Sequence, residues 1–283
     1  MPWSKPLFLA VGFCVMLPSV RAETLATARP HTFDIVLNFG AGLTTDEQAV
    51  LVQAANYWKS IITGYKATTG PAITGLKISV SSTTNDGAGG ILAYTSAGGY
   101  VDEYGEDEQF SYATTASLVI DSDDAGSMLS GGYLYDVAVH EIAHALGFGT
   151  LWLNNGLYVS GSGQYTGAAA LAAYRTEFNK PDATYVPVEL EGGLGTANCH
   201  WDEVNVGAAA TGITDSQGRD MRDELLTGWV NLPASSLFIS QTTIHSFEDL
   251  GYTLVPEPGT LMLLGVAVGL LAWRTRRRSS PPV

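Results

Sequence analysis

The pattern of apolar and polar side chains predicts regular structure mainly in the first half of the chain. Residues 33–39 alternate between apolar and polar and are rich in β-branched and aromatic side chains, which predicts a strand. Residues 44–61 predict a helix of about four turns, because Thr44 and Glu47 have the spacing of a capping box and apolar side chains then recur at helical intervals. Three further strands are predicted, over residues 76–81, 91–95 and 117–121.

A second helix is predicted over residues 133–146, after the helix-breaking glycine pair at residues 131–132. Residues 98–109 are rich in glycine and acidic side chains and predict a loop. The order strand, helix, three strands, helix predicts an α+β fold built on a mixed sheet. Beyond residue 147 regular signals are sparse, and only a short helix over residues 240–250 is predicted. We therefore expect two lobes, residues 23–148 with the sheet and a more irregular lobe over residues 149–254.

The N-terminal end has the pattern of a targeting segment. Residues 1–22 combine the positive charge of Lys5, an apolar run over residues 7–17 and a small residue, Ala22, at the end, as in a signal peptide. The alternative is an uncleaved anchor, but the apolar run is shorter than the about 20 residues that a membrane span needs. We therefore predict a cleaved signal peptide.

The C-terminal end, residues 255–283, also has the pattern of a targeting segment. Val-Pro-Glu-Pro at residues 255–258 precedes an apolar run over residues 259–273 and four arginines within residues 274–278. This order resembles the PEP-CTERM sorting signal of bacterial envelope proteins. The resemblance implies a helix in the cytoplasmic membrane, cleavage by an exosortase-type sorting enzyme and export of the body to the envelope or exterior. An ordinary C-terminal membrane anchor is the alternative.

The body between these ends is strongly acidic. Residues 23–255 carry 8 basic and 27 acidic side chains, a net charge of −19. Such a body repels phosphate backbones, so nucleic acid is not an expected partner. Cys14 lies in the N-terminal apolar run, which leaves Cys199 as the single cysteine of the body and excludes an intramolecular disulfide there.

The predicted helix over residues 133–146 contains the motif H-E-x-x-H. His140 and His144 are four residues apart, so both imidazoles project from one helical face and can share a cation. Glu141 can reach a water at that cation without being a ligand. On a solvated or core helix, two imidazoles and a buried carboxylate would be costly polar groups without a purpose. We therefore interpret the motif as a metal site.

A catalytic zinc site usually has three protein ligands and one open position for water. The candidates for the third ligand are His31, His200 and His245. Spacing alone does not choose among them. A glycine-rich loop precedes His200 and could fold back over a cleft, which favours this residue.

The motif HEIAHALGFG at residues 140–149 resembles that of the leishmanolysin-type metalloproteases, a branch of the metzincin zinc peptidases. In that family a long insertion precedes the third histidine, whereas most other metzincins place it where this chain has Thr150. The similarity continues through GGLGT at residues 192–196, His200-Trp201 and DELLTG at residues 223–228, and it covers residues 130–254.

The resemblance implies a zincin-like α+β fold and one Zn²⁺ held by His140, His144 and His200. It further implies a metalloendopeptidase that cleaves protein or peptide substrates with Glu141 as general base. Asp136 precedes His140 by one turn and is either a partner of a ligand imidazole or a solvated residue. A non-catalytic envelope protein on a zinc-binding scaffold is the main alternative function, and a zinc hydrolase of non-peptide substrates is another.

Several features depart from the family or stay open. Leu226 stands where the family has a methionine beneath the metal, the disulfides of eukaryotic relatives are missing, and we expect no pro-segment with a blocking cysteine. Cys199 adjoins His200, but a half-buried thiol is favoured over a metal contact. Two acidic runs could bind Ca²⁺ or form a solvated acidic surface: residues 103–108, and Asp121 with Asp123 and Asp124. Neither run fits an EF-hand.

Overall fold

The computed structural model describes residues 31–256 except residues 71, 106–107 and 205–206. The predicted signal peptide and almost all of the predicted sorting segment lie outside these residues. Within residues 31–256, apart from those gaps, no helix combines the length and apolar character that crossing a membrane requires. The predicted membrane helix over residues 259–273 lies outside the described residues.

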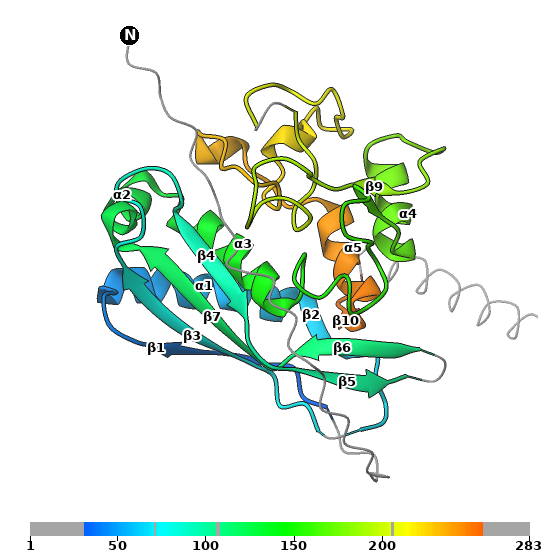
Figure 1. The fold of residues 1–283 in the computed structure, drawn as a ribbon, viewed down its shortest axis with the longest axis horizontal. Helices are drawn as coiled ribbons and strands as arrows, with labels where there is room; N and C mark the ends of the chain where they lie inside the picture. Colours follow the sequence, from blue (N-terminus) through cyan, green and yellow to red (C-terminus); the bar gives the residue numbers. More distant parts are fainter. Residues whose placement is uncertain (1–30, 71, 106–107, 205–206, 257–283) are drawn as a thin grey trace, which may run out of the picture.

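A four-stranded mixed sheet forms the base of the first half of the chain, in the order β1-β3-β7-β4 (Figure 1). Strand β1 is parallel to β3, β3 is parallel to β7, and the edge strand β4 runs antiparallel to β7. The strands comprise β1 (Ile35–Phe39), β3 (Leu76–Thr83), β4 (Ala93–Ala97) and β7 (Thr115–Asp121). The predicted α+β class and the mixed sheet are confirmed.

The side-chain pattern of strand β3 shows why the helices cover only one face of the sheet. Leu76, Ile78 and Val80 are buried, whereas Lys77 and Ser79 between them are exposed. Because successive side chains of a strand point to opposite faces, one face is apolar and the other is solvated. The helices of the first half therefore pack on a single face of this sheet.

Helices α1 (Thr45–Ile61) and α3 (Leu134–Leu146) lie against each other on that face. The predicted capping box starts α1: Thr44 Oγ1 accepts a hydrogen bond from Glu47 N, and the Glu47 carboxylate accepts one from Thr44 N. The fully buried indole of Trp58 donates to the carbonyl of Val139 at 2.9 Å and so fixes α1 to α3. This contact sets the depth at which α3 lies in the core.

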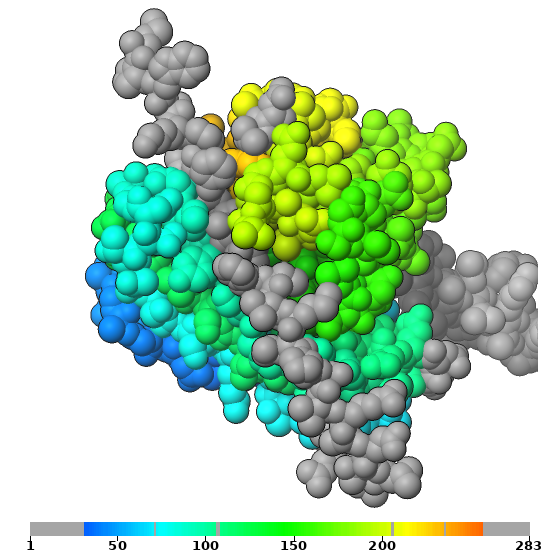
Figure 2. Space-filling model, viewed as in Figure 1, coloured from blue at the N-terminus to red at the C-terminus, as the bar shows by residue number. Residues whose placement is uncertain are grey.

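The second half of the chain is built from two packed helices and many loops. The elements are β8 (Gln164–Tyr165), α4 (Ala168–Glu177), β9 (Val186–Pro187), the 3-10 turns η1 (Met221–Asp223) and η2 (Ala234–Ser236), α5 (Gln241–Asp249) and β10 (Tyr252–Leu254). Strand β10 returns to the first half and pairs with β2 (Ile62–Tyr65). Figure 2 shows the later residues, in yellow and orange, lying against the sheet-bearing half.

Several elements differ from the sequence-based prediction. Part of the predicted loop over residues 98–109 is an antiparallel hairpin of β5 (Tyr100–Tyr104) and β6 (Gln109–Ala113). Helix α2 (Ser122–Gly131) occupies residues that we had not assigned, and Asp121 caps it by accepting from Asp123 N at 2.9 Å. Helix α4 was also missed, although its alanine-rich sequence has high helix propensity.

Candidate metal centre

Helix α3 places His140 and His144 on its buried side, one turn apart. Their Nε2 atoms lie 2.9 Å from each other, and neither side chain is more than 1% exposed. Gly147 ends the helix with a φ of 120°, a backbone conformation that favours glycine. The chain can therefore leave α3 directly beneath the two imidazoles.

His200 reaches the same point from a loop of the second half. Its Nε2 atom lies 3.1 Å from that of His144 and 3.2 Å from that of His140. The three imidazoles form a group that could hold a metal ion, and within the described residues it is the one group of three or more candidate ligand side chains. The favoured reading of the sequence thus agrees with the geometry, while its assignment as a zinc site stays a prediction.

The approach of the His200 loop to the end of α3 depends on a glycine. Gly149 has a φ of 70°, and a Cβ atom at this position would lie 2.4 Å from the carbonyl oxygen of Cys199. A side chain there would push the two segments apart. Gly149 therefore brings the residue before His200 into contact with the exit of the helix.

Each imidazole is oriented by a backbone carbonyl at its Nδ1 atom. His140 Nδ1 lies 2.6 Å from the oxygen of Leu225, His144 Nδ1 lies 2.8 Å from that of Phe148, and His200 Nδ1 lies 2.9 Å from that of Thr196. Carbonyl oxygens only accept, so each Nδ1 carries the proton and each neutral ring presents an Nε2 lone pair. Three lone pairs thus converge on one point, where a cation would relieve their repulsion.

The ionisation of the histidines fits this arrangement. Burial, followed by the neighbouring imidazoles, lowers the pKa of His140 and His144 well below the ordinary value, and burial lowers the pKa of His200 to about 4. All three rings are therefore neutral near pH 7, the form that binds metals. Tetrahedral Zn–N bonds of about 2.05 Å separate the nitrogens by ~3.3 Å, close to the spacing of the three Nε2 atoms. The residues present fit a zinc ion.

Glu141 lies beside this group and is completely buried. Neither oxygen of its carboxylate has a hydrogen-bond partner within the described part of the chain. Burial raises the pKa of Glu141 to about 8. The Thr95 hydroxyl on β4 donates to the backbone carbonyl of Glu141 at 3.0 Å, not to its carboxylate. A buried carboxylate without partners is expensive, which indicates that it serves a ligand or a reacting molecule.

The other candidate ligands lie elsewhere. His31 accepts from the backbone N–H of Ile73 through Nδ1, and His245 on α5 lies 3.3 Å from a carboxylate oxygen of Glu248. Thr150 donates to the carbonyl of His144 at 2.7 Å and supports the helix end instead of replacing a ligand.

The structure decides between the alternatives for two further residues, Asp136 and Cys199. A bond from Asp136 to a ligand imidazole is wrong, because backbone carbonyls occupy all three Nδ1 atoms. Asp136 is partly buried, and burial raises its pKa to about 6. Cys199 is buried, and its thiol does not belong to the group of candidate metal ligands.

Within the described residues, the side chains of the acidic runs do not form a group of three or more candidate metal ligands. Asp121 accepts from Asp123 N and Asp86 N, and Asp124 accepts from Gly89 N at 2.9 Å, so these carboxylates tie a turn to α2. In the other run, Glu103 is buried at the β5–β6 hairpin, while residues 106–107 lie outside the described residues. The possible Ca²⁺ site at Asp121, Asp123 and Asp124 is therefore not supported.

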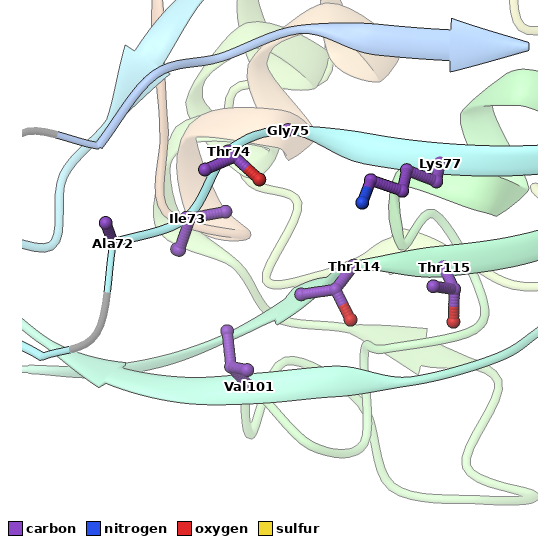
Figure 3. Close-up of a pocket in the computed structure, with 8 residues that line it drawn as sticks. All are labelled: Ala72, Ile73, Thr74, Gly75, Lys77, Val101, Thr114 and Thr115. Carbon is purple, nitrogen blue, oxygen red and sulfur yellow. The ribbon is translucent and has the colours of Figure 1, made fainter.

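A hollow of about 170 Å³ opens on the far end of the sheet, away from the histidines. Figure 3 shows Lys77 of β3, Val101 of β5 and Thr114 before β7 around it. No residue of the histidine group lines this hollow, so it is separate from the candidate metal centre.

Comparison with known proteins gives two findings. Residues 254–278 match the PEP-CTERM protein-sorting motif, which indicates export and association with the cell envelope. A leishmanolysin homolog of Crithidia fasciculata is 31% identical over 127 residues, which cover 40% of this chain. The matched region spans 16% of that relative's own length. The chain is therefore similar to part of a leishmanolysin homolog and carries a sorting motif.

Proposed function

We propose that the chain is a zinc-dependent metalloendopeptidase that hydrolyses peptide bonds of protein substrates. The convergence of three proton-free Nε2 atoms beside an unpartnered, buried Glu141 carboxylate carries the proposal. The partial similarity to a leishmanolysin homolog supports a metallopeptidase at the level of the family. His140, His144 and His200 would hold the metal.

The chain's own residues divide the chemistry between them. Zinc held by the three imidazoles would supply Lewis acidity and lower the pKa of water toward ~7. The charge of a bound zinc ion would oppose the effect of burial on the pKa of Glu141 and favour its carboxylate form. Glu141 would then accept the proton of the attacking water and deliver it to the nitrogen of the leaving amine. Its lack of partners among the described residues leaves both carboxylate oxygens available for this transfer. The carbonyls of Leu225, Phe148 and Thr196 would hold the imidazoles in the required tautomer.

Substitution of Glu141 separates hydrolysis from metal binding. In the full chain, Glu141→Gln keeps the volume of the side chain but removes the general base. We expect zinc content to stay at the level of the wild type while cleavage of casein or of a peptide library disappears. Retained cleavage by this variant would contradict the mechanism. A wild type that binds zinc and cleaves none of these substrates would instead favour a non-catalytic scaffold.

The sorting motif supports a proposal about where this activity would act. We propose that an exosortase-type enzyme recognises residues 254–278 and that the body acts at the cell envelope or outside the cell. Deletion of residues 257–283 should change the fraction in which the protein is found. An unchanged distribution between membrane and medium would contradict a role of this segment in sorting.

A further inference from the structure

The carboxylate of Glu224 accepts four hydrogen bonds, none of them from a histidine of the candidate metal centre. Its side chain is fully buried. One oxygen accepts from the backbone N–H of Ser240 at 3.0 Å, from the Ser240 hydroxyl at 2.9 Å and from the Thr243 hydroxyl. The other oxygen accepts from the backbone N–H of Leu226. The carboxylate thus joins the turn at residues 224–227 to the first turn of α5.

The hydrogen bond from Leu226 N–H to Glu224 affects the orientation of His140. Leu225, between Glu224 and Leu226, supplies the carbonyl oxygen that lies 2.6 Å from His140 Nδ1. With Glu224 bound to Leu226 N, the chain around this carbonyl is fixed on the side of the metal centre. Loss of the bond would release the acceptor that orients His140.

The hydrogen bond from the Thr243 hydroxyl to Glu224 affects the position of His200 through Trp201, the next residue in the chain. The indole of Trp201 donates to the Thr243 hydroxyl at 2.8 Å, and this hydroxyl donates in turn to Glu224. The backbone N–H of Trp201 also donates to the carbonyl of Leu226 at 3.0 Å. Both polar groups of Trp201 are therefore held by residues that Glu224 binds directly.

We propose that Glu224 is a positioning residue that holds His140 and His200 in register for a shared metal ion. His144 is outside this network, because the carbonyl that orients it belongs to Phe148. The inference rests on the proposed function in that the shared ion is the zinc of the peptidase. It assigns to this carboxylate a role that the metal-binding motif itself does not contain.

Glu177, the last residue of α4, provides a matched control because it also binds the N-terminus of α5. It accepts from Gln241 N and from Thr242 N, each at 3.0 Å, and so caps the N-terminus of α5 from the outer side. Its hydrogen bonds go to Gln241 and Thr242 and not to the turn at residues 224–227. Glu177→Gln therefore weakens the start of α5 without disturbing the acceptor of His140, whereas Glu224→Gln disturbs both.

The test is a zinc titration of the metal-stripped full chain in competition with a chromogenic chelator. We expect Glu224→Gln to weaken zinc binding by about 10- to 100-fold, the usual effect of losing a partner of a metal ligand. Glu177→Gln should bind zinc as tightly as the wild type even where its melting temperature falls. Wild-type affinity in Glu224→Gln, or an equal loss in both variants, would overturn the proposal.

Thr243 keeps the proposal testable if Glu224→Gln does not fold. Thr243→Val removes the hydroxyl that links Trp201 to Glu224, and Thr243→Ser retains it. We expect Thr243→Val to bind zinc more weakly than the wild type and Thr243→Ser to bind it as tightly as the wild type. Equal zinc affinities of the two variants would overturn the proposal. The affinities decide about Glu224 independently of hydrolysis. A zinc-loaded wild type that cleaves nothing contradicts the proposed peptidase activity, not this role.

Discussion

The Nε2 atoms of His144 and His200 lie 3.1 Å apart, although 56 residues separate the two histidines along the chain. The intervening segment leaves α3 through Gly147, forms the short strand pair β8–β9 and helix α4, and returns beside the helix end at Gly149. A contact of this kind requires that the two halves of the chain pack in one defined arrangement. The metal centre therefore depends on the tertiary fold as much as on the helical motif.

Gly149→Ala should separate these two segments. The new Cβ atom would lie 2.4 Å from the carbonyl oxygen of Cys199, in addition to the strain of a φ of 70°. Gly156→Ala is the matched control, because Gly156 has a φ of 67° but nothing within 4 Å of the added Cβ. We expect the control to lose about 1–2 kcal/mol of stability from backbone strain.

Gly149→Ala should lower the free energy of unfolding, measured in denaturant, by more than the control does. It should also bind zinc more weakly. The zinc titration distinguishes the clash from strain, because only the clash moves His200. If both variants lost the same stability and neither lost zinc affinity, the close approach at Gly149 would not support the metal centre.

Leu226→Met should be nearly neutral. Leu226 is fully buried, and its backbone takes part in the hydrogen bonds around the metal centre: its N–H donates to Glu224 and its carbonyl accepts from Trp201. Leucine and methionine have similar volumes, so the exchange should change stability by less than about 1.5 kcal/mol and leave zinc affinity unchanged. Leu226→Ala, which leaves a cavity, should cost about 2–5 kcal/mol. A large gain in zinc affinity or turnover for Leu226→Met would show that the methionine has a specific role that leucine lacks.

Glu203 should make the metal-free protein less stable at alkaline pH. Burial, followed by the charge of Glu189, raises the pKa of Glu203 to about 9. The folded state therefore keeps a proton that the unfolded chain releases near pH 4.5, so this stabilisation is present at low pH and is lost as pH rises through about 9. Between pH 7 and 9 Glu203 contributes a slope of up to about 1.4 kcal/mol per pH unit, and Glu141, whose pKa is raised to about 8, adds a further loss in the lower part of this range.

Glu203→Gln imitates the protonated side chain and should remove this contribution. We expect the free energy of unfolding of the variant to fall less steeply between pH 7 and 9 and to exceed that of the wild type at pH 9. The exposed Glu191→Gln serves as the control and should keep the wild-type slope. Parallel curves for the wild type and Glu203→Gln in urea unfolding would contradict a proton held at Glu203.

The local signals of the sequence predicted the parts of the fold that local forces determine. The capping box at Thr44 and Glu47 forms as predicted, and α3 ends at the glycine that follows the metal motif. Helix α2 was missed because its acidic start suggested a calcium site, whereas Asp121 acts as an N-cap. An aspartate before two further acidic residues is also a helix-start signal, so this element was within reach of the sequence.

The remaining parts of the candidate site depend on contacts that no local pattern contains. Spacing left His31, His200 and His245 open, and the resemblance to the leishmanolysin type favoured His200, the one that lies beside α3 in the structure. The three carbonyls that orient the imidazoles belong to Leu225, Phe148 and Thr196, whose side chains do not reveal this role. Glu224 likewise appears in the sequence as one acid among many, and its importance follows from burial and from four hydrogen bonds.

X-ray absorption at the zinc edge of the zinc-loaded full chain tests the central claim most directly. The account predicts about one zinc per chain, with three nitrogen ligands at about 2.0–2.1 Å and one oxygen ligand from water. His200→Ala should remove one nitrogen ligand and weaken zinc binding, while His245→Ala should leave the spectrum unchanged. A wild type that binds no zinc, or a His200→Ala variant with the same spectrum and affinity as the wild type, would contradict it.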